Sequence, residues 1–150
     1  HDQKLEVLDQ LIEEANGQPV LVFYNYKHEL DRLQARYPQA IHVKEENVVK
    51  RWNAKEIPIL LANPASAGHG LNLQFGGHIA IWYSPTWNLE FFQQANKRLH
   101  RRGQAETVLI HTLMAKGTID ARIYDIVLRN KEAGQNALLE AVKARIKEVT

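Results

Sequence analysis

Pro19-Val20-Leu21-Val22-Phe23-Tyr24 is a short, nearly unbroken apolar run that contains β-branched and aromatic residues. It follows Asn16-Gly17, a helix-stop signal, so the run predicts a strand buried on both faces, as in a parallel sheet. Further clear runs of this kind are Pro58–Ala62, His78–Tyr83 and Thr107–His111. A weaker run is Ile41–Val43. The chain therefore carries several candidate strands of one parallel sheet.

The segments between these runs carry apolar residues at helical spacing. The expected helices are Leu5–Ile12, Lys27–Arg36, Val48–Lys55, Leu89–Arg101, Thr118–Arg129 and Ala137–Glu148. Apolar strands that alternate with helices predict an α/β fold with a mostly parallel central sheet and helices on both faces. No repeat or Pro/Ser-rich linker interrupts the pattern, so we expect a single domain over 1–150, ending in a C-terminal helical extension at about 131–150.

Composition excludes several classes of protein. The 150 residues are 45% hydrophobic with a net charge of +2, which suits one domain with its own core. The absence of cysteine excludes a disulfide scaffold and a thiol nucleophile, and it agrees with a cytoplasmic location. No apolar run approaches the roughly 18 to 20 residues that span a bilayer. The start, His1-Asp2-Gln3-Lys4, lacks Met and an apolar signal core, so we expect a piece of a longer or processed protein.

The most informative segment is the basic stretch Gln93–Gln104. On a continuous helix, Gln94, Arg98 and Arg101 fall within roughly 60° of arc, opposite an apolar stripe. No acidic residue lies between Phe91 and Ala105. A guanidinium presents a rigid fork of donors that matches phosphate oxygens. The stretch therefore indicates an anionic partner, and a solvated basic face is the alternative interpretation.

Two loops are also candidate binding sites, because ligands of open parallel sheets bind beyond the carboxyl ends of strands. Each loop has a ligand-binding and a purely structural interpretation. Gly68-His69-Gly70 follows the strand at Pro58–Ala62, and its glycines allow backbone amides to approach an anion, although this segment alone favours a plain tight turn without a ligand. Trp87 follows the strand at His78–Tyr83 and is either a core plug or a platform at a binding surface.

Several catalytic signatures are missing from the sequence. There is no Gly-x-x-x-x-Gly-Lys loop for phosphates, no acidic pair after a strand to hold magnesium, and no Gly-x-Ser-x-Gly elbow. The histidines show no spacing typical of zinc ligands, so no metal site is expected. The chain by itself shows no catalytic centre.

Taken together, five segments resemble motifs of the second RecA-like lobe, or helicase C-terminal domain, of Swi/Snf-type superfamily-two DNA-dependent ATPases. Gln94–Gln104 matches motif VI, Gln-Ala-x-x-Arg-x-His-Arg-x-Gly-Gln, which is highly specific. Ser66–Leu73 is similar to motif V. The other segments are Pro19–Asn25 (motif IV), Trp82–Asn88 and Thr118–Ile123. The resemblance covers about Lys4 to Ile126, and the bacterial and phage members of the family look most similar.

The resemblance implies a RecA-like three-layer sandwich and half of an ATPase. ATP and Mg²⁺ would be held between this lobe and an N-terminal lobe of the same polypeptide. Arg101 and Arg98 would act as arginine fingers and Gln94 would order them or the attacking water. Gly68, Gly70 and Asn72 would line the nucleotide cleft. The isolated chain is expected to be inactive.

The resemblance also implies that the complete enzyme is a translocase on double-stranded DNA. The implied DNA-binding residues are Asn25, Lys27, Asn63, Ser66, Trp87 and Asn88. Two departures from the family pattern are Leu89, where the family has Pro, and Asn63-Pro64, where many members have Ser-Thr. Pro64 removes one backbone amide donor from that loop.

Two other hypotheses compete with the half-ATPase. The chain could be a stand-alone α/β module that binds nucleic acid through its basic helix, without a role in ATP hydrolysis. A weaker option is a self-contained α/β enzyme such as a nucleotide-sugar transferase, which catalysis by the purified chain would support.

Overall fold

The computed structural model describes residues 2–65, 71–86, 88–115 and 143–149, and its helices and strands alternate along the chain. The helices are α1 (Asp2–Glu14), α2 (Lys27–Arg36), α3 (Val48–Asn53) and α4 (Leu89–Asn96). The strands are β1 (Val20–Phe23), β2 (Ile41–His42), β3 (Ile59–Ala62), β4 (Ile79–Trp82), β5 (Leu109–Ala115) and β6 (Lys143–Val149). None of the helices in these ranges has the length and apolar character needed to cross a lipid bilayer.

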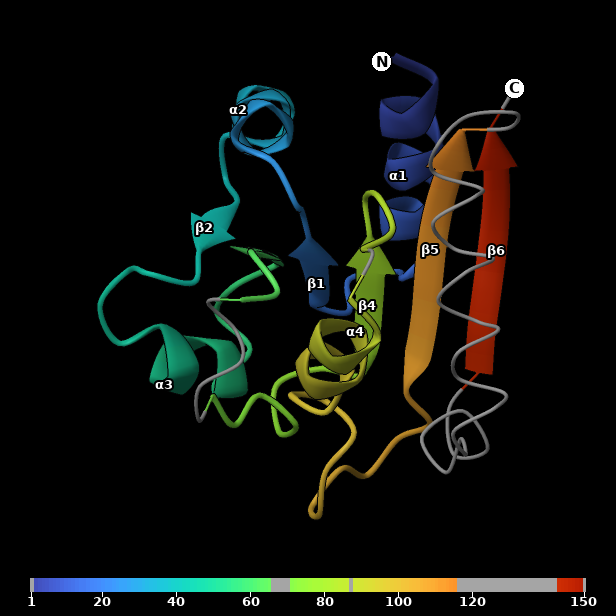
Figure 1. The fold of residues 1–150 in the computed structure, drawn as a ribbon. Helices are drawn as coiled ribbons and strands as arrows, with labels where there is room; N and C mark the ends of the chain where they lie inside the picture. The colour runs from blue at the N-terminus through green and yellow to red at the C-terminus, as the bar shows by residue number, and fades with distance from the viewer. Residues whose placement is uncertain (1, 66–70, 87, 116–142, 150) are drawn as a thin grey trace.

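The described strands form a parallel sheet in the order β2-β3-β1-β4-β5-β6 (Figure 1). β1 lies between β3 and β4, so Val20 is in register with Ile59 on one side and with Ile79 on the other. Because β1 has strands on both edges and helices over both faces, all four of its residues are buried. This confirms the predicted parallel sheet and explains why its strands are continuous apolar runs.

Alternate residues of the strands enter two separate cores, one on each face of the sheet. Leu21 points to the core that contains Trp52 of α3 and Phe92 of α4. Val22 points to the opposite core, which contains Leu8 of α1 and residues of α2. Helices therefore cover both faces, as the sequence predicts, and the molecule has three layers.

The C-terminal segment differs from the prediction. Lys143–Val149 is strand β6, paired in parallel with β5, so the helix predicted at Ala137–Glu148 is wrong over the described residues. The reason lies in two features: Lys143, Arg145 and Lys147 alternate with smaller or apolar residues, a period-two pattern, and β5 offers an edge to pair with. The rest of the expected helical extension at 131–150 and the helix predicted at Thr118–Arg129 lie outside the described residues.

We predict that Phe92→Ala lowers the free energy of unfolding by about 3–4 kcal/mol, because it removes a buried ring from the core. The Phe92 ring centroid lies 5.0 Å from that of Trp82, and the residue is 6% exposed. Phe91 is the matched control, since it is the same side chain one position earlier and is 40% exposed. Phe91→Ala should cost less than about 1 kcal/mol in urea denaturation. Equal costs for the two variants would contradict the assignment of α4's faces.

Candidate functional site

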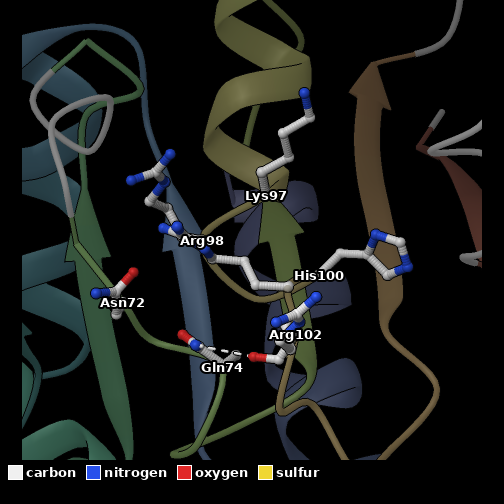
Figure 2. A pocket seen from close by; sticks show the side chains of 7 residues that line it. Asn72, Gln74, Lys97, Arg98, His100 and Arg102 are labelled. Atoms are coloured by element: carbon white, nitrogen blue, oxygen red, sulfur yellow. Dashed lines mark hydrogen bonds between the residues drawn. The ribbon is translucent and has the colours of Figure 1, made fainter.

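An open, positively charged cavity of about 630 Å³ lies between the segment that leads into β4 and the segment that follows α4 (Figure 2). Its lining residues are Asn72, Gln74, Lys97, Arg98, His100, Arg101 and Arg102. We call this cavity the arginine pocket. Four of these side chains carry a positive charge and no acidic residue is among them. Such a cavity favours an anion with several oxygens.

The arginines reach this pocket because α4 ends earlier than predicted. The helix stops at Asn96 rather than continuing to Arg101, so the prediction that one helix face carries Gln94, Arg98 and Arg101 is wrong for the two arginines, which both lie beyond the helix end. At this end of the helix the side chain of Asn96 is fully buried and accepts a hydrogen bond of 2.9 Å from Nε1 of Trp82. After it the backbone tightens, since the N–H of Arg98 donates to the carbonyl of Ala95.

Arg98 is 9% exposed and its guanidinium donates to backbone carbonyls. Nε donates to the carbonyl of Gln94 at 3.2 Å and Nη1 to that of Leu71 at 3.4 Å. In return, the N–H of Leu73 donates to the carbonyl of Arg98 at 3.1 Å. Arg98 therefore joins the segment before β4 to the segment after α4.

Arg101 is exposed at the same pocket. Burial lowers the pKa of Arg98, and the positive charge of Arg101 lowers it further, so the two guanidiniums repel each other. Within the part of the chain that the structure describes, the recorded ion pairs are Lys27–Asp31 and Arg36–Asp9, and neither lies at this pocket. Its positive charge is thus left for a ligand or partner.

The remaining residues predicted for nucleotide binding divide into three groups. Asn72 lines the arginine pocket. The side chain of Gln94 lies outside the lining and donates to Glu90, whereas its carbonyl holds Arg98. Gly68 and Gly70 lie outside the described residues. Gln74, which the sequence analysis missed, is buried in the pocket wall, and nothing in the local pattern marks it.

A second, smaller cavity of about 240 Å³ lies where β1, β3 and β4 end, and we call it the carboxyl-edge pocket. Its lining residues are Asn25, Tyr26, Asn63, Pro64, Pro85, Thr86, Asn88 and Phe91. The structure therefore brings together three of the residues predicted to bind DNA, although they are far apart in sequence. Lys27 is outside the lining and pairs with Asp31 on the surface of α2. Ser66 and Trp87 lie outside the described residues.

Glu29, which is 6% exposed, lies beneath the segments that line the carboxyl-edge pocket and holds them through hydrogen bonds. Its Oε1 accepts hydrogen bonds from the backbone N–H of Asn25 at 2.8 Å and from the Ser84 hydroxyl at 3.0 Å. The Asn25 amide nitrogen donates to the carbonyls of Ser84 and Pro85. Sequence reasoning missed Glu29, although an acidic residue in the first turn of a helix is a recognisable capping signal.

The two pockets lie toward opposite ends of the strands. The carboxyl-edge pocket follows β1, β3 and β4, whereas the segments lining the arginine pocket lead into the starts of β4 and β5. In Figure 1, α4 runs back along the sheet, away from the end of β4. Within the described ranges no cluster of three or more His, Asp or Glu side chains could hold a metal ion.

A profile of the helicase conserved C-terminal domain matches residues 3–103 of this chain. The chain belongs to that family. The match includes both pockets, and together with the INO80 and swr1 relatives it confirms the resemblance to the second lobe of Swi/Snf-type superfamily-two ATPases.

The relatives agree with this membership. The chain is 41% identical over 152 aligned residues to putative protein p41 of Acyrthosiphon pisum secondary endosymbiont phage 1. It is 31% identical to the chromatin-remodeling ATPase INO80 of Mycosarcoma maydis and 29% identical to helicase swr1 of Schizosaccharomyces pombe. These alignments cover 97%, 97% and 93% of this chain but 33%, 9% and 11% of the relatives, respectively. The chain thus spans a third or less of the length of these proteins.

A solved structure, the C-terminal part of the Fun30 ATPase domain, has the same fold. Its TM-score is 0.74 at 24% identity, and the superposition covers 83% of this chain and 44% of that one. The predicted RecA-like α/β fold is confirmed.

We predict that Arg98→Lys lowers the free energy of unfolding by about 1–2 kcal/mol, because an ammonium cannot reproduce the forked bonds to two carbonyls. Arg101→Lys is the matched control, since Arg101 is exposed, and it should change stability by less than about 0.5 kcal/mol. Thermal or urea unfolding of the two variants measures the difference. A neutral Arg98→Lys would show that the guanidinium does not hold the two segments together.

Proposed function

We propose that this chain is the second lobe of an ATP-dependent DNA translocase and that its arginine pocket supplies positive charge to the phosphates of ATP. One observation carries the proposal: the pocket gathers four cationic side chains, contains no acidic residue and exposes Arg101. Isolated positive charge of this density is costly unless an anion occupies it. The family membership and the names of the relatives, which include ATPases and helicases, support ATP as that anion.

Transfer of a phosphoryl group spreads negative charge over its equatorial oxygens, and a guanidinium placed there stabilises the transition state. Arg101 is the residue that we assign to this role, because its side chain is exposed at the pocket. Arg98, the second finger that the resemblance implies, already donates to two carbonyls and would have to exchange these bonds to reach ATP. In the described geometry it positions the segment that carries Arg101.

Gln94 supports this arrangement through its backbone. Its carbonyl accepts from Nε of Arg98, so it helps to order the arginines, as the resemblance implies, without its side chain entering the pocket. Asn72 lines the pocket beside them and is the candidate for a polar contact to the nucleotide.

The proposed site is half of a catalytic centre. The sequence lacks a phosphate-binding Gly-x-x-x-x-Gly-Lys loop, and the lining of the arginine pocket offers no carboxylate for Mg²⁺. The Mg²⁺ ligands and the phosphate loop would come from an N-terminal lobe of the same polypeptide. This chain alone should therefore not hydrolyse ATP.

The carboxyl-edge pocket is the proposed DNA-facing side of the lobe. The side chains of Asn25 and Asn63 bond mainly within the protein, since Asn63 donates to the carbonyl of Asn25 at 3.4 Å. They would shape the surface, leaving Lys27 and the amide nitrogen of Asn88 to meet DNA phosphates. We propose double-stranded DNA as the partner and the cytoplasm as the location.

The first test is Arg101→Ala in the complete two-lobe protein. We expect DNA-stimulated ATP hydrolysis to fall by about 10³-fold or more, the range found when an arginine finger is removed in other phosphoryl-transfer enzymes. The control is Arg32→Ala, which removes an exposed arginine of α2 away from both pockets and should leave turnover unchanged. Wild-type turnover in Arg101→Ala would rule out this residue as the finger.

The second test addresses the stand-alone nucleic-acid-binding module, which the concentration of positive charge also favours. Binding of duplex DNA to the isolated chain is titrated with salt, with and without Arg98→Ala and Arg101→Ala. If the arginines serve ATP, we expect weak binding that the substitutions change little. Tight binding with a steep salt dependence that the substitutions abolish would favour the module instead.

A further inference from the structure

Phe75 is a large apolar side chain that is 57% exposed in a loop whose neighbours are firmly packed. The carbonyl of Leu73 accepts a 2.8 Å hydrogen bond from Nε1 of the buried Trp52. Gly76 and Gly77 pack closely against the same tryptophan, since a Cβ on Gly76 would be 2.2 Å from the Trp52 carbonyl oxygen. Since residues on both sides are held inward, the exposure of Phe75 is imposed by the fold.

The ring of Phe75 packs directly on Gly103, the residue that follows the basic segment. A Cβ on Gly103 would lie 2.7 Å from the Cε1 atom of the ring, and Gly103 has a φ of +95°, so glycine is required there on both counts. The contact fixes the ring beside the end of the arginine-bearing segment and leaves more than half of the residue open to solvent.

Phe75 forms part of the wall of a third cavity, of about 430 Å³, which we call the aromatic pocket. Polar residues complete the wall, among them Lys55, His78, Gln104 and Glu106. Lys55 and Glu106 bring one charge of each sign, whereas the arginine pocket brings four positive charges and no negative one. A group of low charge with a flat face suits the aromatic pocket, and phosphates suit its neighbour.

The two pockets are adjacent. Gln74 lines both, and its amide nitrogen donates to the carbonyl of Arg102 at 3.2 Å, as Figure 2 shows. Arg102 lines the arginine pocket, and the next residue, Gly103, lines the aromatic pocket. A ligand that extends from one pocket into the other would therefore meet positive charge first and an aromatic ring second.

We propose that the aromatic pocket receives the base of a nucleoside triphosphate whose phosphates lie in the arginine pocket, and that the Phe75 ring is the surface on which the base stacks. This inference rests on the proposed function of the arginine pocket and adds a base-binding subsite to it. The order of the pockets matches the order of the chemical groups in such a nucleotide. Aromatic side chains stack on any base, because every base has a π face.

The test is Phe75→Ala in the complete two-lobe protein, with ATP hydrolysis as the assay. We expect the KM for ATP to rise about tenfold, within the range expected for loss of one base-stacking ring, while kcat changes less than about twofold. Phe75→Tyr keeps an aromatic face and should restore the KM to near the wild-type value. Inorganic tripolyphosphate, a competitive inhibitor without a base, should have the same inhibition constant in wild type and Phe75→Ala.

Two results would overturn the proposal. An unchanged KM in Phe75→Ala would show that the ring does not bind the base. An inhibition constant for tripolyphosphate that rises with the KM would show that the ring shapes the arginine pocket and does not contact a base. Either result is distinct from failure of the proposed function, which shows as persistent turnover in Arg101→Ala.

Discussion

The candidate site depends on a reciprocal pair of hydrogen bonds between two segments far apart in sequence. The N–H of Leu73 donates to the carbonyl of Arg98, and the Arg98 guanidinium donates back to the carbonyl of Leu71. These bonds bring the loop before β4 against the turn after α4 and so create the arginine pocket between them. Removing the guanidinium would take its donors from the carbonyls of Gln94 and Leu71 and leave the backbone bond from Leu73 as the recorded link between the two segments.

The two arginines of the pocket lie in different environments, which suit Arg98 for a structural role and Arg101 for contact with a ligand. Arg98 is buried, and its charge is compensated by carbonyl dipoles, whereas Arg101 is exposed and repels it. The folded segment holds Arg101 close to Arg98, and the pocket lining contains no acidic residue. The electrostatic potential in the arginine pocket is therefore positive before any ligand binds. The lobe is thereby prepared for an anion, as the proposed contact with the phosphates of ATP requires.

The connection between β3 and β4 links the two ends of the sheet. It begins at Asn63 in the carboxyl-edge pocket and ends at Asn72 and Gln74 in the arginine pocket. In the proposed function, this one connection therefore contributes residues both to the pocket assigned to DNA and to the pocket assigned to ATP.

Local sequence was sufficient for strands β1 to β5 and for the density of positive charge. Runs such as Val20–Phe23 are apolar because both faces of a central parallel strand are buried. Each residue of the run must therefore be apolar, and the strand can be recognised from these residues alone. Local sequence was insufficient at the end of α4, where helical spacing predicts continuation through Arg101. There α4 ends at Asn96, whose side chain accepts a hydrogen bond from Trp82, and no pattern within α4 shows that Trp82 is its partner.

By itself, then, the sequence determined an α/β fold with a parallel sheet, the family, and a cationic segment without acidic neighbours. Only the folded chain shows that Arg98 is buried while Arg101 is exposed, that Gln74 lines the arginine pocket and Phe75 the aromatic pocket, and that Lys143–Val149 pairs with β5 as a strand. The apolar patterns of strands and the charge of a segment can be predicted from the sequence because they depend only on residues that are close together in the chain. Side-chain direction and hydrogen-bond partners depend on which distant segments pack together.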